Sequence, residues 1–389
     1  MKRMLGIALL AVAVLAAYLL LWPVPIEPVS WNAPKGPGYA GPHAVNQRLA
    51  TLRHLPLGGD VGPEHVVVRE EGGQTWIWMA LVRADQAGGR IVRMRPDGSE
   101  REVIVDTGGR PLGFDFDAEG ALIVADPMFG KHGALLRITG RGAAAQVEVL
   151  SDAVDADPLR YVDAVVVAKT GRIYFSDASR RFGSKAWGGS FEASVLDIIE
   201  HQSTGRILEY HPVTKKTRVV IEGLSFANGV ALSSDEQHIF VSETGEYRIW
   251  KVAVTAQRVQ ARSAASSPSD AAKVLLSNLP GFPDNIMRGQ DGRLWAGLAK
   301  PRSSFSDDNA GRPWLRSLAL RLPRSMWPVP PAYGHVFAFD ETGRVLADLQ
   351  DPSGAYPETS GATEAGEVIY IQSLHSKTLG VLDRRAAGL

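Results

Sequence analysis

Lys169-Thr170-Gly171-Arg172-Ile173-Tyr174-Phe175-Ser176-Asp177 is the stretch that decides the fold, because its pattern recurs along the chain. A polar turn leads into a run of β-branched or aromatic residues, and the run stops at a small or polar residue. Such a run is typical of a buried β-strand. Residues 234–242 and 291–297 repeat the pattern with different side chains.

Six copies of the pattern occur, and their spacing points to one architecture. Their centres are Ile77, Ile123, Tyr174, Phe240, Trp295 and Tyr370. The shortest spacing, 46 residues, fits one four-stranded blade of a propeller, and the longer ones fit a blade plus an insertion. The sequence therefore predicts an all-β, six-bladed β-propeller over residues 47–389. Residues 48–55 would add the outer strand that the last blade lacks and so close the ring.

The N-terminal segment, residues 1–22, differs from the rest of the chain. Lys2 and Arg3 precede an uncharged apolar run, residues 4–22, which is long enough for a transmembrane helix. The basic residues predict a cytoplasmic N-terminus and an extracytoplasmic propeller, periplasmic in a bacterium. A cleaved signal peptide is the alternative interpretation. Residues 23–46 have the Pro/Gly-rich composition of a linker.

Composition narrows the classes of function. The 42 Lys and Arg residues balance 42 Asp and Glu residues, so we expect no nucleic-acid partner. The sequence has no Cys, which excludes disulfides, thiolate metal sites and a cysteine nucleophile. Gly223-Leu224-Ser225-Phe226-Ala227 comes close to the G-x-S-x-G motif but lacks the last Gly, and a predicted strand follows it. A serine nucleophile is therefore disfavoured.

Side-chain oxygens recur at one position of the repeat. Eleven to thirteen residues before the centres, where an innermost strand would begin, lie Glu64, Leu112, Asp163, Asn228, Asp284 and Glu358. The innermost strands of a propeller line one channel, so these positions would form a ring at one mouth. Oxygen ligands without His or Cys suit a divalent metal, most of all Ca²⁺. Such an ion would polarise an ester or lactone carbonyl.

The polar step Asp284-Asn285 lies between apolar residues in Gly281-Phe282-Pro283-Asp284-Asn285-Ile286. For any one such residue, the simpler interpretation is a turn in which the side chain bonds to its own backbone. Recurrence in register favours the metal site. Two histidines are weaker candidates: we expect His65 to pack beneath the mouth and His375 to lie at a blade edge rather than in the channel. Asp115 would supply at most a sixth oxygen.

These motifs resemble a known family. Gly62-Pro63-Glu64, Phe226-Ala227-Asn228-Gly229 and Leu279-Pro280-Gly281-Phe282-Pro283-Asp284-Asn285 are similar to the strictosidine synthase-like branch of the gluconolactonase and paraoxonase superfamily. The most similar group is the membrane-anchored adipocyte plasma membrane-associated proteins. The resemblance covers residues 45–385 and implies a six-bladed propeller, calcium in the channel and hydrolysis of esters or lactones. It places Glu64, Asn228 and Asp284 at metal-ligand positions and Asn285 beside a further one.

Two positions depart from the family pattern. Val162-Asp163 stands where paraoxonase-like enzymes have Asn-Asp, so one amide ligand is missing. Pro111-Leu112-Gly113 stands where they have Pro-His-Gly, which removes a proposed general base. Glu64, Asp163 and a metal-bound water remain as candidates for the base. The catalytic Glu of strictosidine synthases aligns near Glu358 or Ser360, and Ser360 resembles the members that are not synthases, so a condensing enzyme is disfavoured.

The sequence thus predicts a membrane-anchored, calcium-dependent hydrolase of small-molecule esters or lactones. Glu64, Asn228, Asp284 and Asn285 are the metal candidates, and Glu64 and Asp163 are the catalytic candidates. The alternative is a non-catalytic, membrane-anchored propeller that binds a ligand at its mouth. The insertion at residues 300–333, with Trp314 and Leu318 four residues apart among arginines, would cover the mouth, lie on the bilayer or pack on its own blades.

Overall fold

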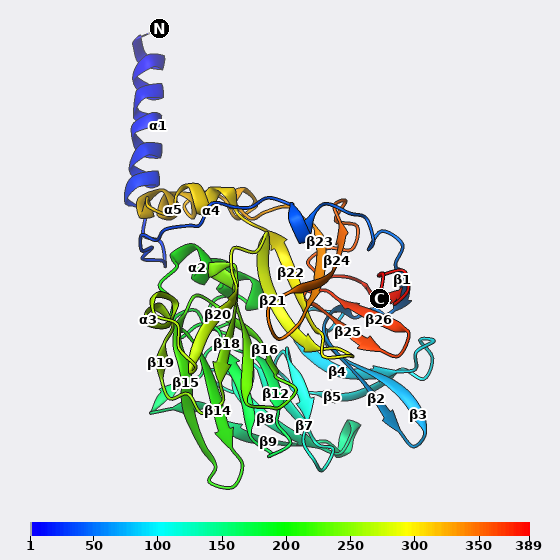
Figure 1. Cartoon of the computed structure of the whole chain (residues 1–389). Coiled ribbons are helices and arrows are strands. Elements are labelled where there is room, and N and C mark those ends of the chain that lie inside the picture. The colour runs from blue at the N-terminus through cyan, green and yellow to red at the C-terminus, as the bar shows by residue number, and fades with distance from the viewer. Residues whose placement is uncertain (1) are drawn as a thin grey trace.

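A ring of six β-sheets surrounds a central channel in the computed structural model, which describes residues 2–389 (Figure 1). Blade 1 consists of β2 (Val61–Glu71), β3 (Gln74–Val82), β4 (Gly89–Met94) and β5 (Glu102–Asp106). Blade 2 consists of β6 (Phe114–Phe116), β7 (Leu122–Asp126), β8 (Ala134–Thr139) and β9 (Gln146–Ser151). Blade 3 consists of β12 (Val162–Val167), β13 (Ile173–Asp177), β14 (Gly205–His211) and β15 (Lys216–Leu224), with β19 (Val259–Gln260) added in parallel at its outer edge.

The second half of the ring repeats this plan. Blade 4 consists of β16 (Ala227–Leu232), β17 (His238–Glu243), β18 (Arg248–Ala253) and β20 (Ala272–Leu276). Blade 5 consists of β21 (Gly281–Arg288), β22 (Leu294–Pro301), β23 (Gly334–Phe339) and β24 (Val345–Asp351). Blade 6 consists of β25 (Gly361–Ala365), β26 (Val368–Gln372), β27 (Thr378–Asp383) and β1 (Arg53–Pro56). A ribbon of β10 (Ala153–Val154) and β11 (Asp157–Pro158) precedes blade 3.

The six-bladed propeller predicted from the repeat is confirmed. The six repeat centres all lie in the second strand of a blade, which is β3, β7, β13, β17, β22 or β26. The closing strand is confirmed as well, because β1 pairs with β27 from Arg53 opposite Val381 to Pro56 opposite Thr378. This pairing covers the outer edge of blade 6 with a strand that precedes blade 1 in the sequence.

Apolar side chains fill the spaces between neighbouring blades. One buried cluster joins Trp78 and Ile91 of blade 1 to Phe114 and Val124 of blade 2. This packing follows from the strand pattern, because each blade has two faces and each face is covered by one of its two neighbours in the ring. The strands therefore have apolar residues on both sides, except where they enter the channel.

Helices α1 (Lys2–Leu21), α2 (Ser190–Glu200), α4 (Ser304–Asp308) and α5 (Pro313–Ala319) lie at one end of the ring (Figure 1). The other helices are short: η1 (Gly41–His43), η2 (Gly142–Ala144) between β8 and β9, η3 (Thr244–Glu246), α3 (Ala261–Ser266) between β19 and β20, and η4 (Arg324–Met326). Helix α1 projects from the propeller, with α4 and α5 at its base and α2 beneath them (Figure 1). Most helices near the channel therefore belong to two insertions, one in blade 3 and one in blade 5.

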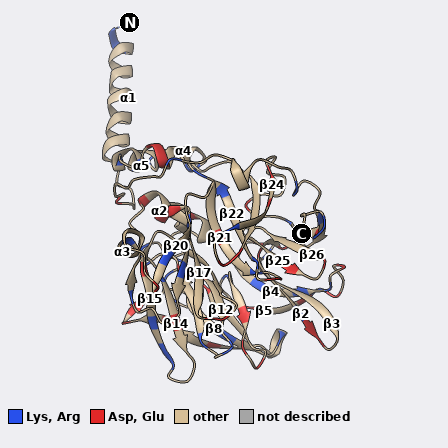
Figure 2. Cartoon of the chain, in the orientation of Figure 1, with Lys and Arg blue, Asp and Glu red and all other residues tan. Residues whose placement is uncertain are grey.

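Helix α1 is long and apolar enough to cross a membrane, and none of its 20 residues is buried. Its Lys and Arg residues lie at the far N-terminal end, and the rest of the helix carries no charge (Figure 2). The base of the helix contacts the blade 5 insertion. Tyr18 Oη donates to the carbonyl oxygen of Arg321 at 3.0 Å, and Arg321 Nε donates to the carbonyl oxygen of Trp22 at 2.6 Å.

The segment after α1 runs over the propeller surface. The backbone N–H of Val29 donates to the carbonyl oxygen of Glu200 at 3.0 Å, and the ring of Trp31 stacks on His201 at 4.0 Å. Arg316 of α5 is buried and donates to the carbonyl oxygen of Ile199 at 2.7 Å. These contacts tie the N-terminal segment, α2 and α5 into one cap over the channel end.

Candidate active site

A pocket lies beneath the cap at one end of the channel. Its floor consists of the side chains of Glu64, Asp163, Asn228 and Asp284, which come from the innermost strands of blades 1, 3, 4 and 5. All four residues are between 4% and 8% exposed. The pocket encloses about 930 Å³, including its open mouth. Residues that are far apart in the sequence are therefore brought together at the mouth.

Each floor residue lies in an irregular part of its strand. The pairing of the first two strands shifts register between Val61 and His65, Val162 and Val165, Ala227 and Val230, and Pro283 and Ile286. One floor residue falls inside each of these four shifts. An extra residue in a strand bends the backbone and redirects a side chain. The shifts thus explain how polar side chains in apolar strands come to face the pocket.

A glycine permits two of these strands to approach closely. A Cβ atom on Gly229 would lie 2.4 Å from the backbone nitrogen of Ile286 and 2.5 Å from the carbonyl oxygen of Asp284. Any larger residue would force blades 4 and 5 apart, because the obstructing atoms belong to the backbone. The Phe226-Ala227-Asn228-Gly229 motif therefore supplies both a polar group and the contact that holds it beside Asp284.

The floor carries an excess of negative charge. Burial and the neighbouring charges of Glu64 and Asp284 raise the pKa of Asp163 well above the ordinary value of an aspartate. Burial and the charge of Glu64 likewise raise the pKa of Asp284, against hydrogen bonds from Asn228 and the backbone of Asn285. Three carboxylates in one buried space repel each other and favour a proton or another cation among them.

Arg110 is a member of the site that we did not predict. It lines the pocket, and its Nη2 lies 3.2 Å from Glu64 Oε2. It precedes the second strand entrance directly, at Pro111-Leu112, so its place in the sequence was a usable signal. One guanidinium next to three carboxylates leaves the negative charge only partly balanced.

The donor set fits a hard divalent cation. The side-chain oxygen of Asn228 is buried and has no hydrogen-bond partner. A buried acceptor without a partner costs free energy, and a cation would satisfy it. Carboxylate and amide oxygens are the ligands that Ca²⁺ prefers. Glu64, Asn228 and Asp284 are thus the residues that could hold such an ion, with Asp163 beside them.

Asn285 lies next to the floor and is already engaged. Its Nδ2 donates to the carbonyl oxygen of Glu64 at 2.9 Å, and Ser360 Oγ donates to the same oxygen at 2.8 Å. These two bonds fix the backbone of Glu64 from blades 5 and 6. In this arrangement Asn285 positions Glu64, and only its side-chain oxygen is left for any further ligand role.

The other two strand entrances do not contribute to the floor. Strands β6 and β25 pair with their neighbours in continuous register, unlike the four bulged strands. Leu112, before β6, is buried in an apolar cluster with Tyr161 and Phe226. Glu358, before β25, bonds to Lys300 and His375 at the side of the pocket. The ring of oxygens is therefore open at blades 2 and 6.

The prediction that His375 lies at a blade edge rather than in the channel is wrong. His375 lines the pocket together with Lys300, although it comes from the turn between β26 and β27. The turn folds over the start of blade 1, where the backbone N–H of Ser373 donates to the carbonyl oxygen of Pro63 at 3.0 Å. No local pattern in the sequence signals this long-range contact.

His65 and Asp115 lie deeper in the channel. His65 is buried with its ring centre 5.1 Å from that of Phe114, and burial lowers its pKa to about 4. It packs beneath the floor, as expected. Asp115 accepts hydrogen bonds from the backbone N–H groups of Val167 and Phe116, both at 2.8 Å. Both residues border a separate cavity in the channel, so Asp115 supplies no sixth oxygen to the floor.

The walls of the pocket are largely apolar. Helix α2 provides Phe191, Val195 and Ile198, and the blade 5 insertion provides Pro328, Val329 and Pro330. Phe226, just before β16, and Phe282, in β21, complete the lining. A pocket with polar groups at its base and apolar sides suits a small organic molecule that presents a polar group to the base.

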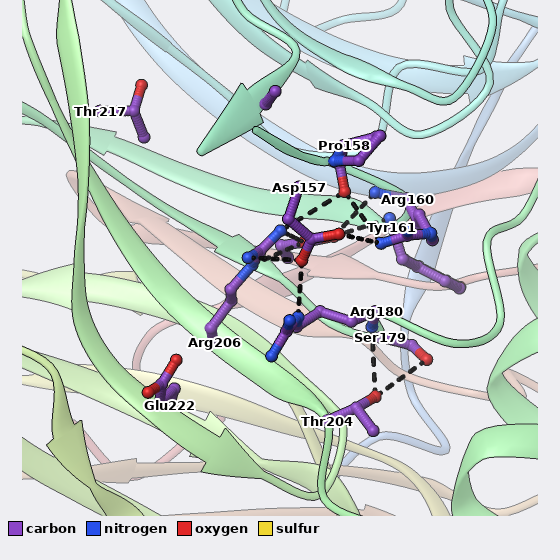
Figure 3. A network of polar contacts seen from close by, with 12 residues as sticks. Asp157, Pro158, Arg160, Tyr161, Ser179, Arg180, Thr204, Arg206, Thr217 and Glu222 are labelled. Atoms are coloured by element: carbon purple, nitrogen blue, oxygen red, sulfur yellow. Dashed lines mark hydrogen bonds and ion pairs between the residues drawn. The ribbon is translucent and has the colours of Figure 1, made fainter. Parts of the chain in front are cut away.

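A network of charged residues supports the third strand entrance (Figure 3). Arg206 Nη1 lies 3.0 Å from Asp157 Oδ2, and Arg180 Nε lies 2.8 Å from the same oxygen. The buried Asp177 accepts from the backbone N–H of Tyr161 at 2.8 Å, and Tyr161 Oη donates to the carbonyl oxygen of Ser190. The network therefore fixes the backbone just before Asp163 and anchors α2 above it.

The comparisons with known proteins agree with this arrangement. Two family models match the chain: strictosidine synthase over residues 163–257, and the N-terminal region of strictosidine synthase-like proteins over residues 41–94. The chain is 36% identical to the protein strictosidine synthase-like 4 of Arabidopsis thaliana, over 86% of this chain and 83% of that protein. The chain belongs to the strictosidine synthase-like family.

Other relatives of this strictosidine synthase-like protein extend the likeness. Human adipocyte plasma membrane-associated protein is 27% identical, over 90% of this chain and 81% of the relative. Among solved structures, a gluconolactonase from Xanthomonas campestris superposes with a TM-score of 0.51 and 18% identity, over 85% of this chain and 97% of the other. At that level of identity the structural likeness establishes a shared propeller fold.

Proposed function

We propose that this strictosidine synthase-like protein is a calcium-dependent hydrolase that cleaves esters or lactones in the capped pocket. The observation that carries the proposal is the convergence of Glu64, Asp163, Asn228 and Asp284 on one buried floor, with the side-chain oxygen of Asn228 unpartnered. Charge of this kind is costly unless a cation balances it. A buried cation facing a ligand pocket is suited to catalysis rather than to structure alone.

The residues of the floor have distinct roles in this proposal. Glu64, Asn228 and Asp284 hold the ion, and Asn285 keeps Glu64 in place through its backbone carbonyl. A bound calcium ion supplies Lewis acidity toward a substrate carbonyl. Asp163 adds negative charge beside the ligands, and Arg110 balances part of it. The family likeness and the gluconolactonase fold favour a carbonyl substrate of the ester or lactone class.

The pocket walls indicate the kind of substrate. Phe191, Ile198 and Val329 face the interior and would exclude water from the acyl or alkyl part of the substrate. The carbonyl group would then lie against the polar floor. An amphiphilic ester or lactone with a hydrocarbon portion fits this division better than a sugar lactone, which has hydroxyl groups on every side.

The protein is, in this proposal, anchored by α1 with its N-terminus cytoplasmic and its propeller extracytoplasmic. The support is the uncharged helix after Lys2 and Arg3 and its contacts with Arg321. The blade 5 insertion then forms a lid at the bilayer surface. Its Trp314 and Met326 are 61% and 60% exposed, and its Pro328-Val329-Pro330 step borders the pocket.

The experiment is a turnover assay of the full-length protein in detergent micelles. Aryl esters and lactones of increasing chain length are offered with calcium and with a chelator. We expect turnover that needs calcium, rises with chain length and is lost in Asp284→Asn. Asp97→Asn, in the exposed turn between β4 and β5, is the matched control and should keep full activity. Calcium-independent turnover, or full activity in Asp284→Asn, would contradict the proposal.

A binding module is the second candidate, and Leu112 favours it. The second strand entrance carries this buried apolar side chain where related enzymes have a histidine. In that case calcium and an amphiphilic ester would bind, but the bound ester would be recovered intact. The same assay therefore separates the two functions.

A further inference from the structure

A second polar group borders the pocket beside the floor. His375 Nδ1 bonds to Glu358 Oε2, and Lys300 Nζ lies 2.7 Å from the other oxygen, Glu358 Oε1. His375 and Lys300 both line the pocket. The side chains of Lys300 and Glu358 are 14% and 13% exposed, whereas that of His375 is 50% exposed. The histidine thus borders the space in which a substrate would lie, and half of its side chain is exposed.

The backbone holds this group rigidly. The N–H of Leu374, next to His375, donates to the carbonyl oxygen of Glu358 at 3.0 Å. Glu358 itself has φ = 53°, a left-handed conformation that is uncommon for a residue with a side chain. Strained backbone of this kind persists where surrounding structure imposes it, and it concentrates at functional sites. On the other side, the ring of Phe191 packs edge-on against His375 at 5.9 Å.

We propose that His375 is the general base of the hydrolase, and that Glu358 is the residue that positions it. The proposal rests on the proposed function, because it assigns a role in that same reaction. The arrangement has the order that base catalysis requires: a carboxylate binds one ring nitrogen, and the other nitrogen, Nε2, is left for a proton of the reactant.

The other candidates for the base are less suited. Glu64 is paired with Arg110 and belongs to the proposed ligands of the ion. Asp163 is only 4% exposed and lies among the proposed ligands, where its charge would help to balance the ion. Glu358, although buried, is kept ionised: hydrogen bonds and charges from His375 and Lys300 outweigh burial and lower its pKa to about 2. In the neutral imidazole, an ionised Glu358 accepts a hydrogen bond from Nδ1–H and so selects the tautomer in which Nε2 is unprotonated.

In the proposed reaction, His375 assists the attack of water on the substrate carbonyl. His375 Nε2 takes a proton from water while the water oxygen forms a bond to the substrate carbonyl carbon, and the carbonyl π pair moves to its oxygen. When that pair returns, the bond from carbon to the alkoxy oxygen breaks. The protonated His375 then gives its proton to the leaving alkoxide. The products are a carboxylic acid and an alcohol, which for a lactone are one hydroxy acid.

The charged groups near His375 come from several parts of the ring. Glu358 precedes β25, Lys300 ends β22, and the floor carboxylates with Arg110 lie across the pocket. Helix α2 contributes the uncharged ring of Phe191. Lys300 is 2.7 Å from Glu358 and neutralises it, so the pair of Lys300 and Glu358 orients the imidazole without adding net charge beside the substrate.

The test compares three variants of the full-length protein in micelles. His375→Ala should lower kcat by roughly 10²- to 10⁴-fold. Added imidazole should restore part of that activity. Glu358→Gln should lower kcat by about tenfold with little change in KM, because it disturbs orientation and not binding. His132→Gln, in an exposed loop, is the matched control and should be fully active. Titration calorimetry with calcium should give the wild-type affinity for all of them.

The outcomes separate this inference from the proposed function. If His375→Ala hydrolyses the ester at the wild-type rate, the role of His375 is refuted, whereas calcium-dependent turnover still supports the hydrolase. If activity is lost together with calcium affinity, or imidazole restores none of it, His375 acts structurally and the inference is equally refuted. A wild-type protein without turnover would overturn both the hydrolase and the role of His375. Calcium titration of wild type and Asp284→Asn would then still show whether the floor binds the ion, because binding is measured independently of turnover.

Discussion

The floor of the pocket and the cluster of His43, His335 and Asp348 both bury carboxylate groups. In the cluster the carboxylate is fully hydrogen-bonded, whereas on the floor negative charge is left in excess. In the cluster, His43 Nδ1 and His335 Nε2 bond to the same oxygen of Asp348 at 2.6 and 2.7 Å. The other oxygen accepts from Asn46 at 3.1 Å and from Gln350. On the floor, three carboxylates lie with one arginine, which pairs with Glu64, and with an unpartnered amide oxygen.

The two regions show how a structural cluster of charged residues differs from a metal-binding site. The ligand atoms of His43, His335 and Asp348 lie within 4.8 Å of one another, so by distance alone they could hold a metal. Every oxygen of Asp348 is already bonded, however, and the cluster ties η1 to blade 5. The floor has charge left over and lies open to a pocket. We therefore expect calcium to bind the floor and the cluster to serve stability.

Removing a floor carboxylate should have the largest effect on activity and on calcium binding. Asp284→Asn should reduce turnover by at least about 100-fold and abolish the rise in melting temperature that calcium causes, because the ion loses a charged ligand. His335→Gln should leave both within about twofold of wild type. Initial rates and thermal melts with and without calcium measure the two effects. Equal losses of turnover and of calcium stabilisation in the two variants would show that the floor and the cluster do not have different roles.

The cluster should respond in stability instead. Asp348→Asn should lower the free energy of unfolding by about 3 kcal/mol, since it removes the anion that two buried rings share. Urea denaturation at pH 7 measures this loss, and Asp383→Asn, exposed at the end of β27, is the control. Turnover at a temperature well below the melting point should remain unchanged. A stable Asp348→Asn protein would contradict the structural role.

The same contribution should depend on pH with a defined sign. Burial alone would raise the pKa of Asp348, but hydrogen bonds from His335 and His43 hold it well below the ordinary value of an aspartate. A lowered folded pKa gives stability that is complete above the ordinary pKa of about 4 and is lost as the pH falls further. Wild type and Asp348→Asn should therefore differ most at neutral pH and converge in acid. Denaturation curves between about pH 2 and 7 would test this.

Asp163→Asn should have the opposite effect on stability in the metal-free protein. The folded pKa of Asp163 is raised, so its stabilising form is fully present below the ordinary aspartate pKa and is lost as the pH rises through the folded value. At pH 7 the substitution should stabilise the chelated protein by about 1 kcal/mol, because it removes a buried like charge. Urea denaturation in chelator provides the measurement, and a loss of stability would contradict the electrostatic account.

Much of this architecture could be predicted from the sequence, because it follows from local repetition. Every blade begins its inner strand after the same turn, so counting back from Tyr174 or Trp295 identifies Asp163 and Asp284. The closing strand could also be predicted, because the last blade lacks an outer strand and residues 48–55 can supply it. Repeating units impose a common geometry on residues that are distant in sequence.

What the sequence could not provide depends on contacts between units. The four register shifts that turn Glu64 and Asn228 toward the pocket leave no pattern that separates them from the regular entrance at Leu112. The place of His375 depends on a turn that crosses to Pro63 of blade 1. Arg110 reaches Glu64 from the loop between blades 1 and 2. Each is a tertiary contact between segments whose separation in the sequence has no fixed period.

A smaller effect is expected from Arg110, which balances part of the negative charge of the floor. Arg110→Gln should tighten calcium binding about threefold, because the cation that competes for Glu64 is removed and the floor becomes more negative. Calorimetric titration at low and high salt measures the change, which should shrink as salt screens the charges. Arg83→Gln, on the exposed surface beside Asp106, is the control. Weaker binding in Arg110→Gln would mean that the arginine orders the ligands.

The central claim is that the floor, and not the cluster, binds calcium. Calorimetric titration of calcium into the full-length protein in micelles tests it most directly, with wild type, Asp284→Asn and Asp348→Asn compared at one temperature below all melting points. The account predicts one calcium ion per chain in wild type and in Asp348→Asn, and no measurable heat of binding in Asp284→Asn. Binding that survives in Asp284→Asn and disappears in Asp348→Asn would contradict it.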